Sequence, residues 1–236
     1  MSGQLYLLPT TLGADNLQTI PPYVIDRIHQ LEVFIVERGK TARQFIKQTK
    51  TPIPFAEMQF FELNKRTNPA DWKSFLLPAL NEGKDIGLIS EAGCPGVADP
   101  GAEIAQLAHQ LGIRVNPMVG PSSILLALMA SGMNGQQFAF HGYLPIKNPD
   151  RKKKLQQLEQ ESRRNQQTQL FIETPYRNNA LLEESLQCLH NNTLFCVAAD
   201  ITLPTEYIYT LPVGEWQKAT LPDLHKRPTL FLLLAP

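Results

Sequence analysis

The sequence predicts an α/β protein that consists of two α/β domains, and two observations carry this prediction. In the first half of the chain, short apolar runs typical of strands alternate with segments of helical periodicity. In the second half, apolar runs outnumber helical segments, which is typical of a second and more strand-rich sheet. We expect residues 1–117 to form the N-terminal domain and residues 118–236 the C-terminal domain, with the hinge in the proline-bounded stretch 117–121.

The elements of the first half follow from run length and periodicity. Short apolar runs predict buried strands, and longer segments with apolar residues every three or four positions predict helices. In order, these are a strand at 5–8, a helix at 21–30, a strand at 33–36, helices at 41–48 and 71–81, a strand at 86–89, a helix at 102–111 and a strand at 115–119. Thr41 is the expected cap of one helix, and Pro78 is expected to kink the next. Strands separated by helices indicate a parallel or mixed sheet covered on both faces.

The second half is expected to begin with a helix at 122–130 and to end in a second sheet. Its further elements are strands at 138–140, 170–172, 194–199, 206–210 and 230–234, and a helix at 177–190. The one dense basic cluster of the sequence lies after the first of these strands and consists of Lys147, Arg151, Lys152, Lys153, Lys154, Arg163 and Arg164. A solvated helix face is the default interpretation of such a cluster, and contact with phosphate groups is the alternative.

Composition limits how charged partners can bind, because any such partner must be met by a local patch of charge. The 236 residues include 22 Lys and Arg and 22 Asp and Glu, so the formal net charge is zero and no global field attracts nucleic acid or an anionic membrane. The longest apolar stretch, residues 230–235, is too short to span a bilayer. The N-terminus has no basic region before an apolar one, so we expect no signal peptide and a cytoplasmic location.

Cysteine and histidine usage argues against a metal site. Cys94, Cys188 and Cys196 form no CxxC pair, and the 5 histidines show no ligand spacing. We therefore expect a reducing compartment and no metal. Cys94 lies inside a glycine-rich loop, where a small side chain tolerated at a tight turn is a simpler interpretation than a nucleophile, because no histidine is nearby in the sequence.

Two turn-rich segments identify a candidate ligand site. Residues 90–101 (SEAGCPGVADPG) and residues 119–123 (VGPSS) each follow an expected strand and lead into an expected helix. In an open α/β sheet, small ligands bind at such strand ends. Neither GxxxxGK[ST] nor a GxGxxG that opens a helix in a βαβ unit is present, so no nucleotide fingerprint is met. A proline-rich loop of this kind suits the zwitterionic tail of a methionine-type cofactor, and the alternative is that both segments are only connecting turns.

The segment 90–101 resembles the S-D-A-G-T-P-G-I-S-D-P-G loop of the ribosomal RNA small subunit methyltransferase I family, which belongs to the tetrapyrrole methylase superfamily. Further matches keep the order of the family: Leu5–Leu7, Gly112–Ile113 with Val115, Pro117–Ser122, Ala127–Leu128 with Ser131–Gly132, Phe138–Pro145 followed by Lys147, and Glu173–Arg177, which is similar to E-[ST]-P-[HY]-R. The resemblance implies two α/β domains with the cofactor cleft between them, and S-adenosylmethionine (S-adenosyl-L-methionine) as methyl donor. It also implies a ribose 2′-hydroxyl of small-subunit ribosomal RNA as acceptor, and a homodimer.

The resemblance further assigns the residues that are expected to bind the cofactor. They are Leu12, Gly93, Cys94, Val97, Ser123, Ile124, Thr174, Ala199 and Thr229. For the apolar members of this set, ordinary core packing is the alternative interpretation.

A ribose hydroxyl that accepts a methyl group must lose a proton, so a base near the cleft would assist the reaction. The candidate catalytic residues are Glu37, Glu91 and Glu173, with Asp99 as a further carboxylate. A solvated or capping carboxylate is the default interpretation of each. Asp99 precedes a proline at an expected helix start, where N-capping explains it.

Three departures from the family pattern affect the substrate side. The first turn, A-T-P-I-G-N in the family, is Pro9–Gly13 here with extra residues after it, and A-E-D-T-R is reduced to Val36–Arg38. The stretch A-R-E-L-T-K corresponds to Ala199–Leu203, with Asp200 in place of the arginine. These departures leave two alternatives open: a methyltransferase that acts on a tetrapyrrole or another small molecule, and a cofactor-binding module without catalysis.

Overall fold

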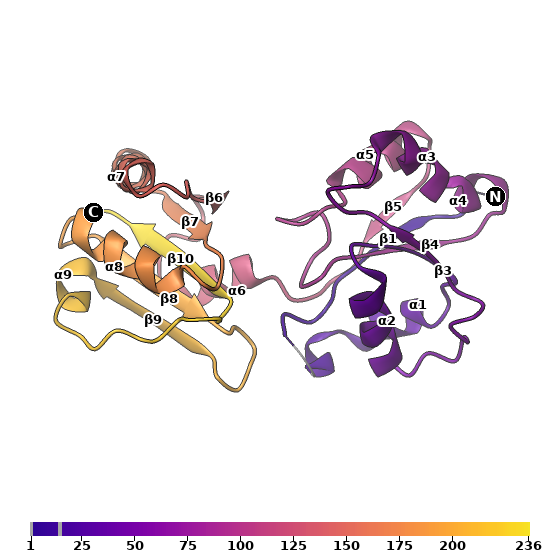
Figure 1. Cartoon of the computed structure of the whole chain (residues 1–236), viewed down its shortest axis with the longest axis horizontal. Helices are drawn as coiled ribbons and strands as arrows, with labels where there is room; N and C mark the ends of the chain where they lie inside the picture. Colours follow the sequence, from indigo (N-terminus) through magenta and orange to yellow (C-terminus); the bar gives the residue numbers. More distant parts are fainter. Residues whose placement is uncertain (1, 14–15) are drawn as a thin grey trace. The chain divides into compact units, whose positions relative to one another are not determined.

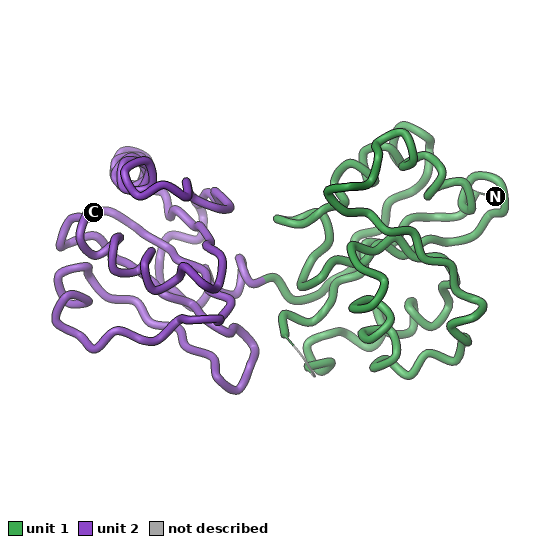
Figure 2. Tube along the Cα trace, in the orientation of Figure 1, with its two compact units in different colours: residues 1–122 green, residues 123–236 purple. Residues whose placement is uncertain are grey.

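The computed structural model describes residues 2–13 and 16–236 of the chain (Figure 1). The chain divides into two compact units, Met1–Ser122 (unit 1) and Ser123–Pro236 (unit 2), which Figure 2 distinguishes by colour. Each unit contains one five-stranded sheet. The boundary that the sequence analysis places after residue 117 precedes this division by the connection 118–122. Within the described ranges, no helix combines the length and the apolar character that crossing a membrane requires.

Unit 1 is built on a parallel sheet with the strand order β3-β2-β4-β1-β5. The strands are β1 (Leu5–Leu8), β2 (Val33–Val36), β3 (Gln59–Glu62), β4 (Ile86–Ile89) and β5 (Val115–Pro117). Every pairing between them is parallel, as expected for strands joined by helical crossovers. Strands β2 and β4 are buried along their whole length, which explains why their sequences are continuous apolar runs rather than alternating ones.

Helices cover both faces of the unit 1 sheet (Figure 1). The helical segments are η1 (Leu17–Thr19), α1 (Pro22–Ile28), α2 (Gly39–Gln48), η2 (Pro69–Asp71), α3 (Trp72–Phe75), α4 (Leu77–Asn81) and α5 (Ala102–Gln110). On one face, Val24 of α1 and Phe45 of α2 share an apolar cluster with Phe34 of β2. On the other face, Ile104 of α5 clusters with Ile35 of β2. Phe34 and Ile35 enter opposite clusters because side chains alternate along a strand.

The helices of unit 1 differ from the expectation in two places. The helix expected at 71–81 is divided into α3 and α4, and the break lies beside Pro78, where the sequence predicts a kink, because proline has no N–H to continue the hydrogen bonding of α3. Helix α2 begins at Gly39 with Arg38 as its N-cap. The expected cap, Thr41, therefore lies inside the helix, where its hydroxyl donates to the carbonyl oxygen of Arg38 at 3.1 Å.

Unit 2 contains a mixed sheet with the strand order β6-β7-β10-β8-β9. The strands are β6 (Phe138–Tyr143), β7 (Thr168–Ile172), β8 (Leu194–Ala199), β9 (Tyr207–Pro212) and β10 (Thr229–Leu234). Strands β6 and β7 pair in parallel, and the other pairings are antiparallel. The helices are α6 (Ser123–Ser131), α7 (Asn148–Asn165), α8 (Asn178–Cys188) and α9 (Val213–Trp216).

An aromatic cluster forms the core of unit 2. Phe171, Phe195 and Phe231 lie on three adjacent strands, and the ring centroids of Phe171 and Phe231 are 6.0 Å apart. Trp216 of α9 packs in the same cluster, and its indole N–H donates to the carbonyl oxygen of Phe195 at 2.8 Å. This packing holds the ends of β7, β8 and β10 in fixed positions relative to one another.

Candidate functional site

In unit 1, the loops that carry most of the candidate residues begin at one edge of the sheet. Leu8 of β1 and Val36 of β2 both lie beside Ile89 of β4 in the parallel register. The chain leaves these three strands in the same direction, so the segments that follow them gather at the carboxyl edge. They are the first turn after β1, the residues after β2, and the glycine loop 90–101.

The glycine loop is attached to the first turn by its backbone. The Thr10 N–H donates to the carbonyl oxygen of Gly93 at 2.9 Å, and the Gly93 N–H donates to the carbonyl oxygen of Thr10 at 3.2 Å. Gly93 has a φ of +70°, and a Cβ there would lie 3.1 Å from Leu12 Cδ2 and 3.2 Å from the carbonyl oxygen of Pro121. Three distant segments therefore converge at Gly93, and only glycine suits both this backbone conformation and this space.

Cys94 lies at the same point of convergence. Its thiol is 3.5 Å from the carbonyl oxygen of Pro121, and burial raises the pKa of this thiol above its usual range. Cys94 is therefore a protonated hydrogen-bond donor, which agrees with a small side chain in a tight turn and disfavours a nucleophile. Val97 is 49% exposed, so the core-packing alternative does not apply to it.

A cavity of about 220 Å³ lies beside the loop within unit 1. Its walls are the turn 10–13, the segment 89–92, and the face of α2 that carries Thr41, Gln44 and Gln48. Leu12 is part of this wall, and so is Glu91. The wall is mixed: Leu12, Ala42, Phe45, Ile89 and Ala92 are apolar, and the threonine, glutamine, serine and glutamate side chains are polar. Such a wall suits a ligand that has both apolar surface and hydrogen-bonding groups.

Carboxylates form a cluster at the same edge of the sheet. Burial, followed by the charges of Glu37 and Glu91, raises the pKa of Asp99 to about 6. Burial and the charge of Glu91 also raise the pKa of Glu37, while Glu91 accepts a hydrogen bond from the Thr41 hydroxyl at 2.5 Å. The N-cap of α5 is Gly101, with no side-chain cap among the described residues. The capping role expected for Asp99 is therefore wrong.

In unit 2, three candidate residues gather at one end of the sheet. Ala199 and Thr229 lie directly opposite each other in the antiparallel register of β8 and β10. On the other side of β10, Leu230 pairs with Ile172, so Thr174 follows β7 at the same end. Ser123 and Ile124 open α6, a helix that packs against β8, β9 and β10, and both are partly exposed.

Glu173 is buried at the end of β7 and occupied by internal contacts. Its Oε1 accepts hydrogen bonds from the Thr174 N–H and from Arg177, each at 2.6 Å. Burial raises the pKa of Glu173, but the bonds from Arg177 and Thr174 outweigh it, so the pKa lies below the usual range. An ionised carboxylate held this way is a weak base. Its second oxygen, Oε2, is buried and finds no hydrogen-bond partner within the described part of the chain.

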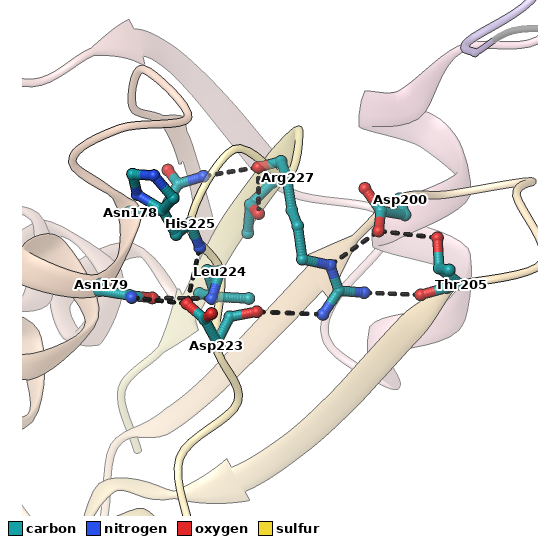
Figure 3. Close-up of polar contacts among 9 residues, drawn as sticks. Asn178, Asn179, Asp200, Thr205, Asp223, Leu224, His225 and Arg227 are labelled. Atoms are coloured by element: carbon teal, nitrogen blue, oxygen red, sulfur yellow. Dashed lines mark hydrogen bonds and ion pairs between the residues drawn. The ribbon is translucent and has the colours of Figure 1, made fainter.

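Sequence reasoning did not identify Arg227, which stands beside the position of the missing arginine. Its Nε donates to Asp200 Oδ2 at 2.7 Å (Figure 3). The preceding residues are attached to α8: Asn179 Nδ2 donates to Asp223 Oδ1 at 2.8 Å, and the Leu224 N–H donates to Asn179 Oδ1 at 2.7 Å. A long-range ion pair of this kind leaves no local sequence signal, because its partners are 27 residues apart in the chain.

The basic cluster of the sequence divides into structural and exposed members. Arg151 is buried in α7, where it forms an ion pair with Glu184 of α8 and donates to the carbonyl oxygen of Ile146 at 3.0 Å. It is therefore not a free phosphate contact. Lys147 and Lys153 are exposed. No group of three or more His, Cys, Asp or Glu side chains in the described ranges is arranged to hold a metal ion.

Comparison with known families decides the identity of this arrangement. The sequence profile of the Tetrapyrrole (Corrin/Porphyrin) Methylases matches residues 8–217. The chain belongs to this family. It is a methyltransferase, and the expectation drawn from its glycine loop is confirmed.

Curated relatives match over most of the chain. It is 29% identical over 238 residues to the Ribosomal RNA small subunit methyltransferase I of Escherichia coli O157:H7. This alignment covers 98% of this chain and 77% of that protein. It is 32% identical to the protein of the same name from Vibrio cholerae, over 89% of this chain and 69% of the relative. These relatives are therefore longer than this chain.

Solved structures share the fold. The methyltransferase CobJ superposes with a TM-score of 0.64 at 17% identity, over 99% of this chain and 95% of that one. Cobalt precorrin-4 methyltransferase CbiF superposes with a TM-score of 0.63 at 14% identity, over 98% and 94%. At these identities the likeness shows the fold alone, and the prediction of a methylase-like α/β fold is confirmed.

Proposed function

We propose that this methyltransferase uses S-adenosylmethionine to methylate a ribose 2′-hydroxyl of small-subunit ribosomal RNA. The observation that carries the proposal is the similarity to proteins named Ribosomal RNA small subunit methyltransferase I along 98% of the chain. The specific glycine loop 90–101 lies within the matched region. A homodimer in the cytoplasm is part of the same proposal.

The donor contacts Leu12, Gly93, Cys94 and Val97 of unit 1 in this proposal. In unit 2 it contacts Ser123, Ile124, Thr174, Ala199 and Thr229. Two observations fit such a ligand. Leu12 lines the cavity beside the glycine loop, and the buried Glu173 Oε2 lacks a hydrogen-bond donor that an ammonium or hydroxyl group of the ligand would supply.

The protein contributes mainly orientation to the reaction. S-adenosylmethionine supplies a methyl group on a sulfonium whose departure leaves a neutral thioether. Alignment of the acceptor oxygen with this methyl group therefore accounts for much of the rate. The acceptor hydroxyl also loses a proton, and Asp99 is the carboxylate whose pKa, about 6, is best matched to accept it near neutral pH. Glu37 and Glu91 tune this pKa in the proposal.

A methylation assay tests the acceptor. Purified protein is incubated with radiolabelled S-adenosylmethionine and small ribosomal subunits from a strain that lacks the corresponding gene. The RNA is then cleaved with alkali. A ribose 2′-O-methyl group blocks cleavage at one phosphodiester, so one new protected position is expected. Label in a tetrapyrrole added in parallel, with none in RNA, would select the small-molecule alternative.

Calorimetric titration tests the donor independently of the acceptor. Binding of S-adenosylmethionine by the purified protein is expected, with saturation below millimolar concentration. Binding without transfer to RNA or to tetrapyrrole would favour the cofactor-binding module without catalysis. Absence of binding at millimolar S-adenosylmethionine would contradict the assignment of the donor site.

A further inference from the structure

A guanidinium group lies beside position 200, where the family pattern has an arginine. The family stretch A-R-E-L-T-K corresponds to Ala199–Leu203, where Asp200 replaces the arginine. Arg227 approaches from the segment before β10, and its Nε lies 2.7 Å from Asp200 Oδ2 (Figure 3). A cation is thus present beside position 200, and it comes from the segment before β10.

The Arg227 side chain joins the β8–β9 connection to the segment before β10. Besides the contact with Asp200 after β8, its Nη2 donates to the carbonyl oxygen of Thr205 at 2.6 Å, and its Nη1 donates to that of Asp223 at 3.3 Å. The backbone carbonyl of Arg227 accepts from Asn178 Nδ2 at 2.7 Å. A planar guanidinium with several fixed donors makes such a junction, which a lysine cannot reproduce.

Asp200 is equally constrained. Its N–H donates to the carbonyl oxygen of Pro228 at 2.9 Å, and its Oδ2 also accepts from the Thr205 hydroxyl at 2.9 Å. Its φ is +50°, a region that aspartate and asparagine tolerate better than most residues. The side chains of Asp200 and Arg227 are 8% and 24% exposed, so solvent and salt screen this ion pair less than a surface pair.

These contacts lie next to two residues of the proposed donor site. Asp200 follows Ala199 at the end of β8, and Arg227 precedes the start of β10 at Thr229; Ala199 and Thr229 are directly paired. The Thr229 hydroxyl donates to the carbonyl oxygen of Arg227 at 3.0 Å. The ion pair therefore connects the two segments that flank these paired strand ends.

We propose that the Asp200–Arg227 ion pair is a positioning device that sets the paired strand ends at Ala199 and Thr229 for binding of the methyl donor. Both are positioning residues, since they act through their neighbours. The inference rests on the proposed function, because it takes the strand ends at Ala199 and Thr229, whose side chains are buried, to border the donor.

The test is a double-mutant cycle on donor affinity. Asp200→Asn removes the charge and keeps a residue that accepts the positive φ, and Arg227→Gln removes the partner. Each single variant is expected to weaken S-adenosylmethionine binding about tenfold, and the double variant no further, because the two residues act as one unit. Arg227→Lys is expected to fall between wild type and Arg227→Gln. In methyl transfer, KM for the donor rises and KM for the RNA stays unchanged.

A control pair separates positioning from stability. Glu184→Gln breaks the buried ion pair between α7 and α8, so it lowers the melting temperature and leaves donor affinity unchanged. If Asp200→Asn and Arg227→Gln also lower only the melting temperature, the pair is structural and the inference is wrong. If wild type binds no S-adenosylmethionine, the proposed function itself fails, and this inference fails with it.

Discussion

At the scale of single residues, Gly93 and Cys94 differ in how well they tolerate substitution. The Cys94 thiol donates weakly to the carbonyl oxygen of Pro121, and a threonine hydroxyl at this position can donate to the same acceptor. Cys94→Thr is therefore expected to change the dissociation constant for S-adenosylmethionine by less than about threefold, under ~1 kcal/mol. Gly93→Val is expected to weaken binding far more, because a side chain at φ +70° is strained and meets Leu12. Calorimetric titration measures both constants. Loss of transfer in Cys94→Thr with intact donor binding would make the thiol a chemical participant and contradict this interpretation.

Asp99 supports a prediction about pH. Burial, Glu37 and Glu91 raise its pKa from 3.8 to about 6, so the folded protein holds this proton more tightly than the unfolded chain. Its contribution to stability is then greatest at low pH and is lost as the pH rises through about 6. Asp99→Asn should raise the melting temperature at pH 8 and change it little at pH 4. Equal shifts at both pH values would refute the raised pKa.

The same substitution tests the proposed base. Methyl transfer by wild type is expected to fall as the pH drops below about 6, where the Asp99 carboxylate becomes protonated. Asp99→Asn should lower kcat over the whole range and remove this limb of the pH profile. An unchanged profile in the variant would assign the base to another group.

At the scale of secondary structure elements, α7 carries one buried cation, Arg151, beside several basic side chains that are not buried. The Arg151–Glu184 pair is nearly inaccessible, with side-chain exposures of 8% and 4%. Removing one partner leaves a buried charge, so Glu184→Gln is expected to lower the free energy of unfolding by roughly 3 kcal/mol. Urea denaturation monitored by circular dichroism measures this change. A change below the error of the method would mean that water replaces the lost partner.

The alternative interpretation of the basic cluster, contact with phosphate groups, can be tested on the lysines of α7. Replacing Lys152, Lys153 and Lys154 together with glutamine should weaken RNA binding uniformly across sequences and reduce its dependence on salt concentration. The melting temperature should stay close to that of wild type, because none of the three is buried. Binding isotherms at several salt concentrations give the slope of affinity against salt concentration. An unchanged slope would mean that these lysines form only a solvated helix face.

Secondary structure was predictable where a local pattern is strong and uncertain where it is weak. Strands β2 and β4 are buried on both faces, so their continuous apolar runs predict them from the sequence. Strand β3, with the sequence QFFE, lies at the edge of its sheet with both ends exposed, and the sequence analysis does not predict it. Its pairing with β2, rather than its own pattern, makes it a strand.

At the scale of the whole molecule, the proposed homodimer predicts a mass in solution. Light scattering across micromolar concentrations should give twice the chain mass of 26.5 kDa. A constant monomer mass over this range would contradict the dimer. Since the donor residues are proposed within one chain, donor binding gives a separate measurement that does not depend on assembly.

The sequence by itself determined the fold class, the methylase family and the importance of the glycine loop, because these depend on local patterns and on a specific motif. Only the tertiary structure decided the roles of particular side chains. In the tertiary structure, Gly93 forms backbone hydrogen bonds with Thr10, Arg151 is buried in an ion pair with Glu184, and Arg227 forms an ion pair with Asp200. The reason is physical: burial and pairing of a charged group depend on residues far away in the chain, and no local pattern of sequence records them.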